Sequence, residues 1–342
     1  MTAVREGLTV GLHDPVTDPE PADWEALRAR AGLRANWAWP VMRAGVLSGA
    51  DPVLLAVLSD VEGPVGLVAA SVVAPRRSAA GASAPGFPRV GYLHVQAPQS
   101  SAVPGFWFAS PAVQERASLV RAFRRAARRT LGPGVRGALW RQLGEGDDAW
   151  LPWPRYTRDT EPLAVLDAPE SVDAWLAGLG QKRRASVRRT QRLVAADPDL
   201  QVRTGRVGEV VTPAELAHLT RLNFAKHAAG SVELRSGPRS EVWQASVAGR
   251  ADVCIVAYRD AAGRLLGAAT ILDDPVWPVW LSWGALPVED GGRRHLYFDL
   301  FRRLVERVVD RGARGMILGK GMSELKSDLG AHLVPQHGAV TA

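Results

Sequence analysis

Lysine is rare in this chain, and two of its lysines lie close together in a glycine-rich segment. Only four of the 42 basic residues are lysine, and Lys320 and Lys326 are six positions apart. Lysine carries a compact ammonium group whose pKa shifts on burial, whereas arginine keeps a planar and permanently charged guanidinium group. Residues 317–330 are therefore the first candidate site, and the alternative is a glycine-rich turn with solvated charges.

A second basic segment runs from Lys182 to Arg192, with six cations and no acid. On a helix, Arg184 and Arg188 share one face, and Lys182, Arg189 and Arg192 share another. Such charge density predicts either a solvated surface or contact with a phosphate-bearing donor. A further arginine stripe, interpreted as the polar face of an amphipathic helix, consists of Arg121, Arg124, Arg125 and Arg128.

The sequence contains no clear candidate for a catalytic nucleophile or for a metal site. Cys254 is the single cysteine, which excludes disulfides and a cysteine-based zinc site within one chain. It lies within a strand-like run without an adjacent histidine, and there is no Gly-x-Ser-x-Gly turn. His218 and His227 are nine residues apart, which is not metal-ligand spacing on one helix face. We assign no nucleophile and no metal.

The composition is that of a soluble protein with more than one domain. The mass is 36.7 kDa, the net charge is +7 and the mean hydropathy is close to zero. The size predicts two domains, and no apolar run approaches the roughly 20 residues of a membrane helix. Residues 1–7 have no apolar core of the kind that marks an export signal, and we expect a cytoplasmic protein. The excess of arginine over lysine is typical of a high-GC genome, so the net charge favours a nucleic-acid partner only slightly.

Two halves of the chain show the same order of predicted elements. The boundary falls in a linker-like patch at residues 144–154, which gives domains at 1–150 and 151–342. The first half is predicted to contain a helix at 23–30, strands at 53–59, 66–73 and 90–95, a mobile loop at 74–88, a helix at 111–130 and a strand at 135–140. The second half is predicted to contain strands at 161–166, 200–203, 253–258, 265–272, 279–283 and 315–318, with helices at 171–177, 182–196, 212–228 and 295–311.

A helix between the last two strands makes that pair of strands parallel in each half. The predicted fold class is α+β, with two similar lobes, each a mixed and mostly antiparallel sheet flanked by helices. Ser171 is the predicted N-cap of the first helix of the second half.

Three stretches of the second half carry a resemblance to a known family. They are the basic helix at 179–192, the strands Gly267–Leu272 and Trp280–Ala285, and the closing helix, strand and glycine–lysine–glycine turn at 295–330. In this order they resemble the GNAT superfamily of acyltransferases, in its two-lobed FemABX and CelD-like branch. The resemblance covers residues 163–335, and the first half matches in element order only.

The resemblance implies roles for individual residues. Catalytic groups are expected at Tyr297, where many GNAT enzymes keep a leaving-group acid, and at Glu324 and Lys326. His295 and the backbone near Ser282, Trp283 and Gly284 are expected to bind substrate. The residues expected to bind the phosphates of the donor are Lys182, Arg184, Arg188, Arg189, Arg293 and Arg294.

The stretch before the closing helix departs from the coenzyme-A-binding pattern. Members that use coenzyme A place closely spaced glycines there, so that backbone amides cradle the pyrophosphate. Here the chain offers Gly291 and Gly292, but their spacing differs from that pattern. The donor therefore stays open between acyl-CoA and aminoacyl-tRNA, either of which would be a co-substrate rather than a tightly bound cofactor.

The sequence leads to an N-acyltransferase that joins an acyl or aminoacyl group to a small-molecule or peptide amine. One alternative is a peptidyltransferase that uses aminoacyl-tRNA and has tRNA as a partner. The other is a catalytically silent GNAT-fold module that binds nucleic acid or a protein partner through its arginine helices.

Overall fold

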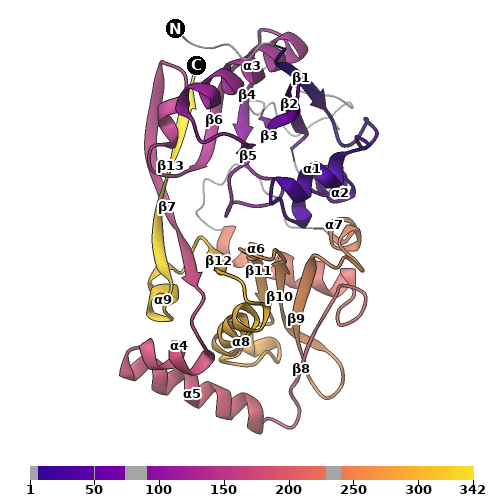
Figure 1. Cartoon of the computed structure of the whole chain (residues 1–342). Coiled ribbons are helices and arrows are strands. Elements are labelled where there is room, and N and C mark those ends of the chain that lie inside the picture. Colours follow the sequence, from indigo (N-terminus) through magenta and orange to yellow (C-terminus); the bar gives the residue numbers. More distant parts are fainter. Residues whose placement is uncertain (1–6, 50, 74–90, 229–239) are drawn as a thin grey trace. The chain divides into compact units, whose positions relative to one another are not determined.

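The structure is a computed structural model that describes residues 7–49, 51–73, 91–228 and 240–342 (Figure 1). The loop predicted at 74–88 lies outside these residues. The chain forms two compact units, of which unit 1 contains residues 1–161 together with the C-terminal residues 335–342. Unit 2 contains residues 162–334. Two strands run from one unit into the other, β7 (Arg155–Asp167) and β13 (His332–Thr341).

Unit 1 is built on a mixed sheet with the strand order β1-β2-β3-β4-β6-β13, and β5 pairs with β3. The predicted hairpin is present as β2 and β3, and the predicted parallel pair is present as β4 and β6. The strands are β1 (Thr9–His13), β2 (Val53–Asp60), β3 (Gly63–Val73), β4 (Gly91–Val95), β5 (Phe106–Phe108) and β6 (Val135–Leu143), and the helices are α1 (Trp24–Arg30), α2 (Trp39–Leu47) and α3 (Val113–Leu131).

Unit 2 is built on a second mixed sheet, with the strand order β7-β12-β11-β10-β9-β8. The strands β9, β10 and β11 form an antiparallel meander, β8 pairs antiparallel with β9, and β11 and β12 are the predicted parallel pair. The strands are β8 (Gln201–Gly205), β9 (Val253–Arg259), β10 (Leu265–Leu272), β11 (Val279–Ala285) and β12 (Gly315–Gly319). The helices are α4 (Val172–Gly178), α5 (Gln181–Ala196), α6 (Pro213–Ala228), α7 (Glu241–Ser246), α8 (Leu296–Arg311) and α9 (Ser323–Asp328).

Local sequence explains where several of these helices begin. The predicted N-cap of α4 is confirmed, because the amide of Ala174 donates to the Ser171 hydroxyl at 3.0 Å. A capping box begins α6, where the Glu215 amide donates to the Thr212 hydroxyl and the Glu215 carboxylate accepts from the Thr212 amide. Helix α8 ends at Gly312, whose left-handed backbone suits glycine.

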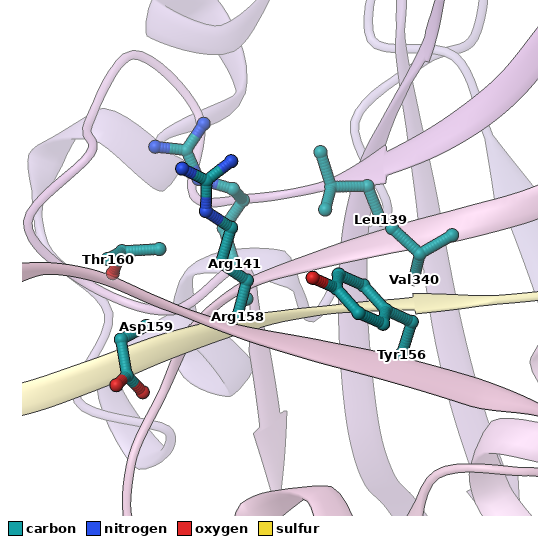
Figure 2. Close-up of a pocket in the computed structure, with 8 residues that line it drawn as sticks. Leu139, Arg141, Tyr156, Arg158, Asp159, Thr160 and Val340 are labelled. Carbon is teal, nitrogen blue, oxygen red and sulfur yellow. The ribbon is translucent and has the colours of Figure 1, made fainter.

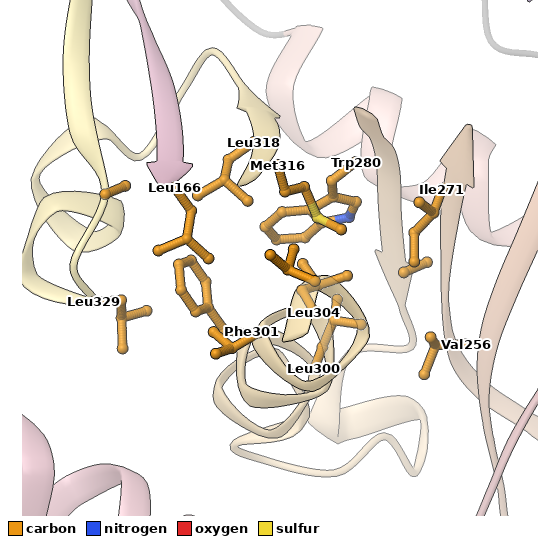
Figure 3. Packing of buried hydrophobic residues seen from close by; sticks show 14 of the residues in the cluster. Leu166, Val256, Ile271, Trp280, Leu300, Phe301, Leu304, Met316, Leu318 and Leu329 are labelled. Atoms are coloured by element: carbon orange, nitrogen blue, oxygen red, sulfur yellow. The ribbon is translucent and has the colours of Figure 1, made fainter. Parts of the chain in front are cut away.

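The core of unit 2 lies between α8 and one face of the sheet (Figure 3). Leu300, Phe301 and Leu304 recur at helical spacing and are fully buried. They pack against strand residues such as Ile271 and Met316, and α4 and α5 pack against α8. This packing fixes the first turn of α8 relative to strands β11 and β12, where the candidate site lies.

Candidate functional site

Strands β11 and β12 pair at a single position. Val279 lies opposite Ile317, and beyond this pair β11 continues to Ala285 without a further bridge to β12. In unit 1 the equivalent parallel strands, β4 and β6, pair along their length from Gly91 to Val95. Unit 2 therefore has a wedge between its parallel strands that unit 1 lacks. We define the wedge as residues 280–285 of β11 and 318–319 of β12.

A β-bulge in β11 sets the side chains at the wedge. Thr270 of β10 lies opposite Ser282 while its neighbour Ile271 lies opposite Trp280, so Leu281 is the extra residue. The bulge turns Trp280 and Trp283 to the same face of the sheet, although three positions separate them. The Trp280 indole nitrogen donates to the Ser282 carbonyl at 3.0 Å, so this oxygen is already bonded.

Gly284, a predicted substrate-binding residue, lies where helix α6 crosses β11. A Cβ atom added there would stand 2.7 Å from the Leu219 carbonyl oxygen, closer than real contacts allow. Glycine at 284 therefore permits close packing of α6 on the strand. Ser282, Trp283 and Gly284 are consecutive residues of β11 within the wedge, and their role in substrate binding stays a prediction.

Tyr297 lies in the first turn of α8 against the two tryptophans of the wedge. Its ring centroid is 5.4 Å from that of Trp280 and 6.5 Å from that of Trp283. The hydroxyl oxygen is buried and has no hydrogen-bond partner in the described structure. Burial raises the pKa of this hydroxyl above its usual range, so the group stays protonated at neutral pH. Tyr297 is thus a proton donor without a partner, next to an unpaired strand edge.

Asp299, two residues after Tyr297 in the first turn of α8, belongs to a buried network. Its carboxylate accepts a hydrogen bond from the Tyr258 hydroxyl at 2.9 Å and one from Arg303 at 2.6 Å. The carboxylate is 2% exposed, and burial together with Asp299 raises the pKa of Tyr258. Because its Oδ2 atom accepts both hydrogen bonds, Asp299 anchors the first turn of α8. Tyr258 was not singled out in the sequence, where it is one apolar-looking residue in a buried strand.

Lys326 is buried, and its ammonium group binds backbone. Its Nζ donates to the carbonyl oxygens of Leu318, Gly319 and Lys320 at 2.9, 3.2 and 3.0 Å, and lies 5.8 Å from the Trp280 ring centroid. An ammonium has three donors that rotate freely, which suits three converging carbonyls, whereas a planar guanidinium does not. This contact explains why lysine is used at this position. Lys326 thus fixes the turn at the end of β12, and Glu324 on the same short helix is exposed.

The loop before α8 uses its own backbone internally. The amides of Asp290, Gly291 and Gly292 donate to the carbonyls of Pro287 and Val288 at 3.1, 3.0 and 2.8 Å. A Cβ atom at Gly292 would stand 2.0 Å from the Leu286 oxygen, so this glycine is required by packing. These amides are therefore not available to cradle a phosphate.

The three predicted residues that follow this loop differ in their surroundings. Arg293 forms an ion pair with Asp197 at 3.2 Å, whereas Arg294 is exposed and has no partner in the described structure. His295 is exposed and has a left-handed backbone with φ 71° at the start of α8. Its carbonyl accepts from the amides of Phe298 and Asp299, so its backbone shapes the helix start.

The predicted basic helix is α5, and its cations divide into two groups. Arg184 donates to the Ala177 carbonyl at 3.1 Å. Lys182, Arg188 and Arg189 are exposed, with no hydrogen bond or ion pair in the described part of the chain. Arg183, which was not among the predicted site residues, forms an ion pair with Asp328. The exposed group is the part of α5 that can contact a polyanion.

Comparisons with known proteins identify the fold. No protein-family model matches the sequence, and no curated protein matches it. The structure of L-PGS from Bacillus licheniformis is similar, with a TM-score of 0.61 and 11% sequence identity over 95% of this chain and 92% of that one. FemX is similar with a TM-score of 0.58 and 9% identity, over 92% of this chain and 95% of that one.

A third similar structure is the C-terminal DUF2156 domain of an Agrobacterium fabrum protein described as a lysylphosphatidylglycerol synthetase. Its TM-score is 0.58 at 13% identity, over 94% of this chain and 92% of that one. At such identities the similarity shows the fold alone. The chain has a GNAT-like fold of the FemABX type, and the predicted fold class and resemblance are confirmed in this respect. Among the described residues, no helix combines the length and apolarity needed to cross a membrane.

Proposed function

We propose that this protein is an N-acyltransferase and that the wedge of unit 2 receives the acyl group of the donor. The observation that carries the proposal is the single bridge between β11 and β12, with the unpartnered Tyr297 hydroxyl beside it. A strand edge without a neighbour offers backbone donors to a carbonyl group placed alongside it. The similarity in fold to FemX and L-PGS supports the same class of reaction.

The proposed reaction is attack by an amine on an activated acyl carbon. The C–N bond forms, the carbonyl oxygen takes up negative charge, and backbone amides of β11 beyond Val279 stabilise that charge. The C–O or C–S bond to the donor then breaks, and Tyr297 gives its proton to the leaving oxygen or sulfur. The proton lost by the amine passes to solvent, since the described residues of the wedge, 280–285 and 318–319, include no carboxylate, imidazole or amine side chain.

In this proposal Lys326 is a positioning residue rather than a group that touches substrate. Its ammonium holds the carbonyls that end β12 and lies near the Trp280 ring, so it keeps one side of the wedge in place. The predicted catalytic role of Glu324 has no geometric support in its exposed position, and it stays a prediction.

We propose aminoacyl-tRNA as the donor ahead of acyl-CoA. The bonded amides of residues 290–292 favour this choice, because these three groups already donate to the loop's own carbonyls and cannot donate to a pyrophosphate. The exposed cations Lys182, Arg188 and Arg189 favour it as well, since they can neutralise phosphates of an RNA strand.

Filter binding across a salt series tests the donor. Charged tRNA should bind more weakly as salt rises, and the double variant Arg188→Gln/Arg189→Gln should lower the salt slope by about 0.7–0.9 for each phosphate that is no longer neutralised. Arg203→Gln, an exposed arginine on β8, is the matched control and should change neither value. Calorimetric binding of acetyl-CoA that disappears in the Arg293→Gln/Arg294→Gln variant would instead assign acyl-CoA as the donor.

A second candidate function is a silent module that binds nucleic acid. It is favoured by the arginines of α3, because Arg121, Arg125 and Arg128 are exposed on one side of that helix. This alternative predicts RNA binding that depends on the α3 arginines, with no transfer of a labelled aminoacyl group to any amine in a mixed acceptor pool. Transfer that is abolished in Tyr297→Phe would exclude it.

A further inference from the structure

Unit 1 contains a pocket that the proposed transfer reaction does not use. It has a volume of about 470 Å³, and its lining comes from β6, β13 and the first part of β7, all within unit 1. The pocket is open to solvent, since Tyr156 is 69% and Val340 50% exposed, and its volume is within the range of small-molecule sites. Figure 2 shows the lining residues on these strands.

The pocket follows from strand alternation. Leu139 and Arg141 of β6, and Tyr156 and Arg158 of β7, each alternate at the two-residue period that places side chains on one face of a sheet. Strand β13 lies between β6 and β7 and contributes Gly338 to the same lining. Strand β13 also contributes Val340, and at Gly338 the floor between the two arginine-bearing strands has no side chain.

Glycine at 338 keeps the pocket open, and the backbone conformation at this position does not require glycine. Its φ is not in the left-handed region, and a Cβ atom there would meet its nearest neighbour, the Trp140 carbonyl oxygen, at an ordinary 3.4 Å. The backbone would therefore accept a larger residue at this position. A larger side chain would instead fill the pocket.

Two arginines provide positive charge in the pocket without an ion pair. Neither Arg141 nor Arg158 forms a hydrogen bond or ion pair in the described structure, and the Nε atom of Arg141 is buried. Figure 2 shows their guanidinium groups on the same side of the strands, with the Asp159 carboxylate pointing to the other side. Both guanidinium groups line the same pocket, so an anion bound there would be attracted by two positive charges.

The remaining lining is largely apolar. Leu139 and Val340 form one wall, and the Tyr156 ring forms another. A ligand that matches both the arginines and the apolar lining has an oxyanion at one end and an apolar or aromatic body at the other. Guanidinium groups bind such oxyanions in a bidentate manner.

We propose that this pocket is a binding site for a small organic oxyanion, a phosphate monoester or carboxylate on an apolar or aromatic body. Arg141 and Arg158 bind the charged head, and Leu139, Val340 and Tyr156 contact the body. The site lies in unit 1, and it does not depend on the transfer reaction proposed for unit 2.

Calorimetry on the full chain with four probes tests the site. Phenyl phosphate and benzoate carry the two candidate heads, benzyl alcohol carries the body without charge, and inorganic phosphate carries the charge without the body. We expect at least one of the two organic anions to bind about tenfold or more tightly than both of the other probes, because charge-assisted hydrogen bonds and apolar contact act together. The tighter of the two anions identifies the head group.

Three variants complete the test. Arg158→Gln should weaken binding of the anion by about tenfold or more, since a charge-assisted hydrogen bond is removed. Gly338→Val should abolish binding by filling the floor, while Arg136→Gln, an exposed arginine of β6 outside the lining, should leave it unchanged. The proposal is overturned if benzyl alcohol binds as well as the anions, if neither anion binds at millimolar concentration, or if Arg136→Gln weakens binding as much as Arg158→Gln.

Discussion

Replacing Tyr297 by phenylalanine should raise stability and lower activity at the same time. The hydroxyl is buried and has no hydrogen-bond partner in the described structure. Burying such a group without a partner costs about 1–3 kcal/mol, and its removal recovers part of that cost. If the same hydroxyl protonates the leaving group, its loss slows transfer by roughly 10²–10⁴-fold.

Tyr258, on strand β9 of the sheet that α8 packs against, gives a matched control. Its hydroxyl is also buried, but it donates to Asp299 at 2.9 Å. Tyr258→Phe should therefore destabilise the protein by about 1–2 kcal/mol, because the carboxylate loses a donor. The two identical substitutions are expected to change stability in opposite directions.

Calorimetric unfolding and a transfer assay measure the two effects. A gain of about 1 kcal/mol corresponds to an increase in Tm of roughly 2–4 °C for a domain of the size of unit 2. A Tyr297→Phe variant that loses stability and activity together would show that the hydroxyl supports the fold instead. Unchanged transfer would show that Tyr297 is not the acid.

Three further predictions concern the supports of the site. Lys326→Met should lower the free energy of unfolding by about 3 kcal/mol or more, because three hydrogen bonds to carbonyls are lost. Lys326→Arg should not restore this stability, because the planar guanidinium group does not match three converging carbonyls. Equal denaturation midpoints for wild type and Lys326→Arg would contradict this expectation. Asp299→Asn should destabilise the protein by roughly 1.5–3 kcal/mol, since Arg303 loses its charged acceptor, and urea unfolding measures the loss. The side-chain hydrogen bond from Arg259 lowers the pKa of Glu215 to about 2, below its unfolded value of about 4.3, so the stabilisation is complete above that value and is lost as pH falls toward 2. The difference in urea midpoint between wild type and Glu215→Gln should therefore shrink between pH 4.5 and pH 2, and a constant difference would refute the assignment.

Much of the fold was predictable because it depends on local periodicity. The predicted helices at 111–130, 182–196 and 295–311, and the predicted strands at 53–59, 253–258 and 265–272, agree with the structure to within a few residues. Strand β13 was not predicted, since Pro335 interrupts its pattern and its partner β6 is distant in sequence. Non-local pairing of this kind leaves no periodic trace in either strand.

The candidate site was predictable as a neighbourhood but not as a set of roles. The sequence placed Lys326 near the end of β12, but the three carbonyls that occupy its ammonium depend on how the turn folds. The bulge at Leu281, which brings Trp280 and Trp283 to one face, also leaves no local pattern. Neither did the sequence predict the internal hydrogen bonds of residues 290–292.

The wedge itself can be tested with methyl NMR, because the chain has only four methionines. Met316 is fully buried on β12, beside the Trp280 indole (Figure 3), whereas Met42 is buried in unit 1. With methyl-labelled methionine and an amide-linked, non-reactive analogue of aminoacyl-adenosine, binding in the wedge should shift the Met316 resonance and leave that of Met42 unchanged. An unshifted Met316 at saturating analogue, or a shift confined to Met42, would contradict acyl binding between β11 and β12.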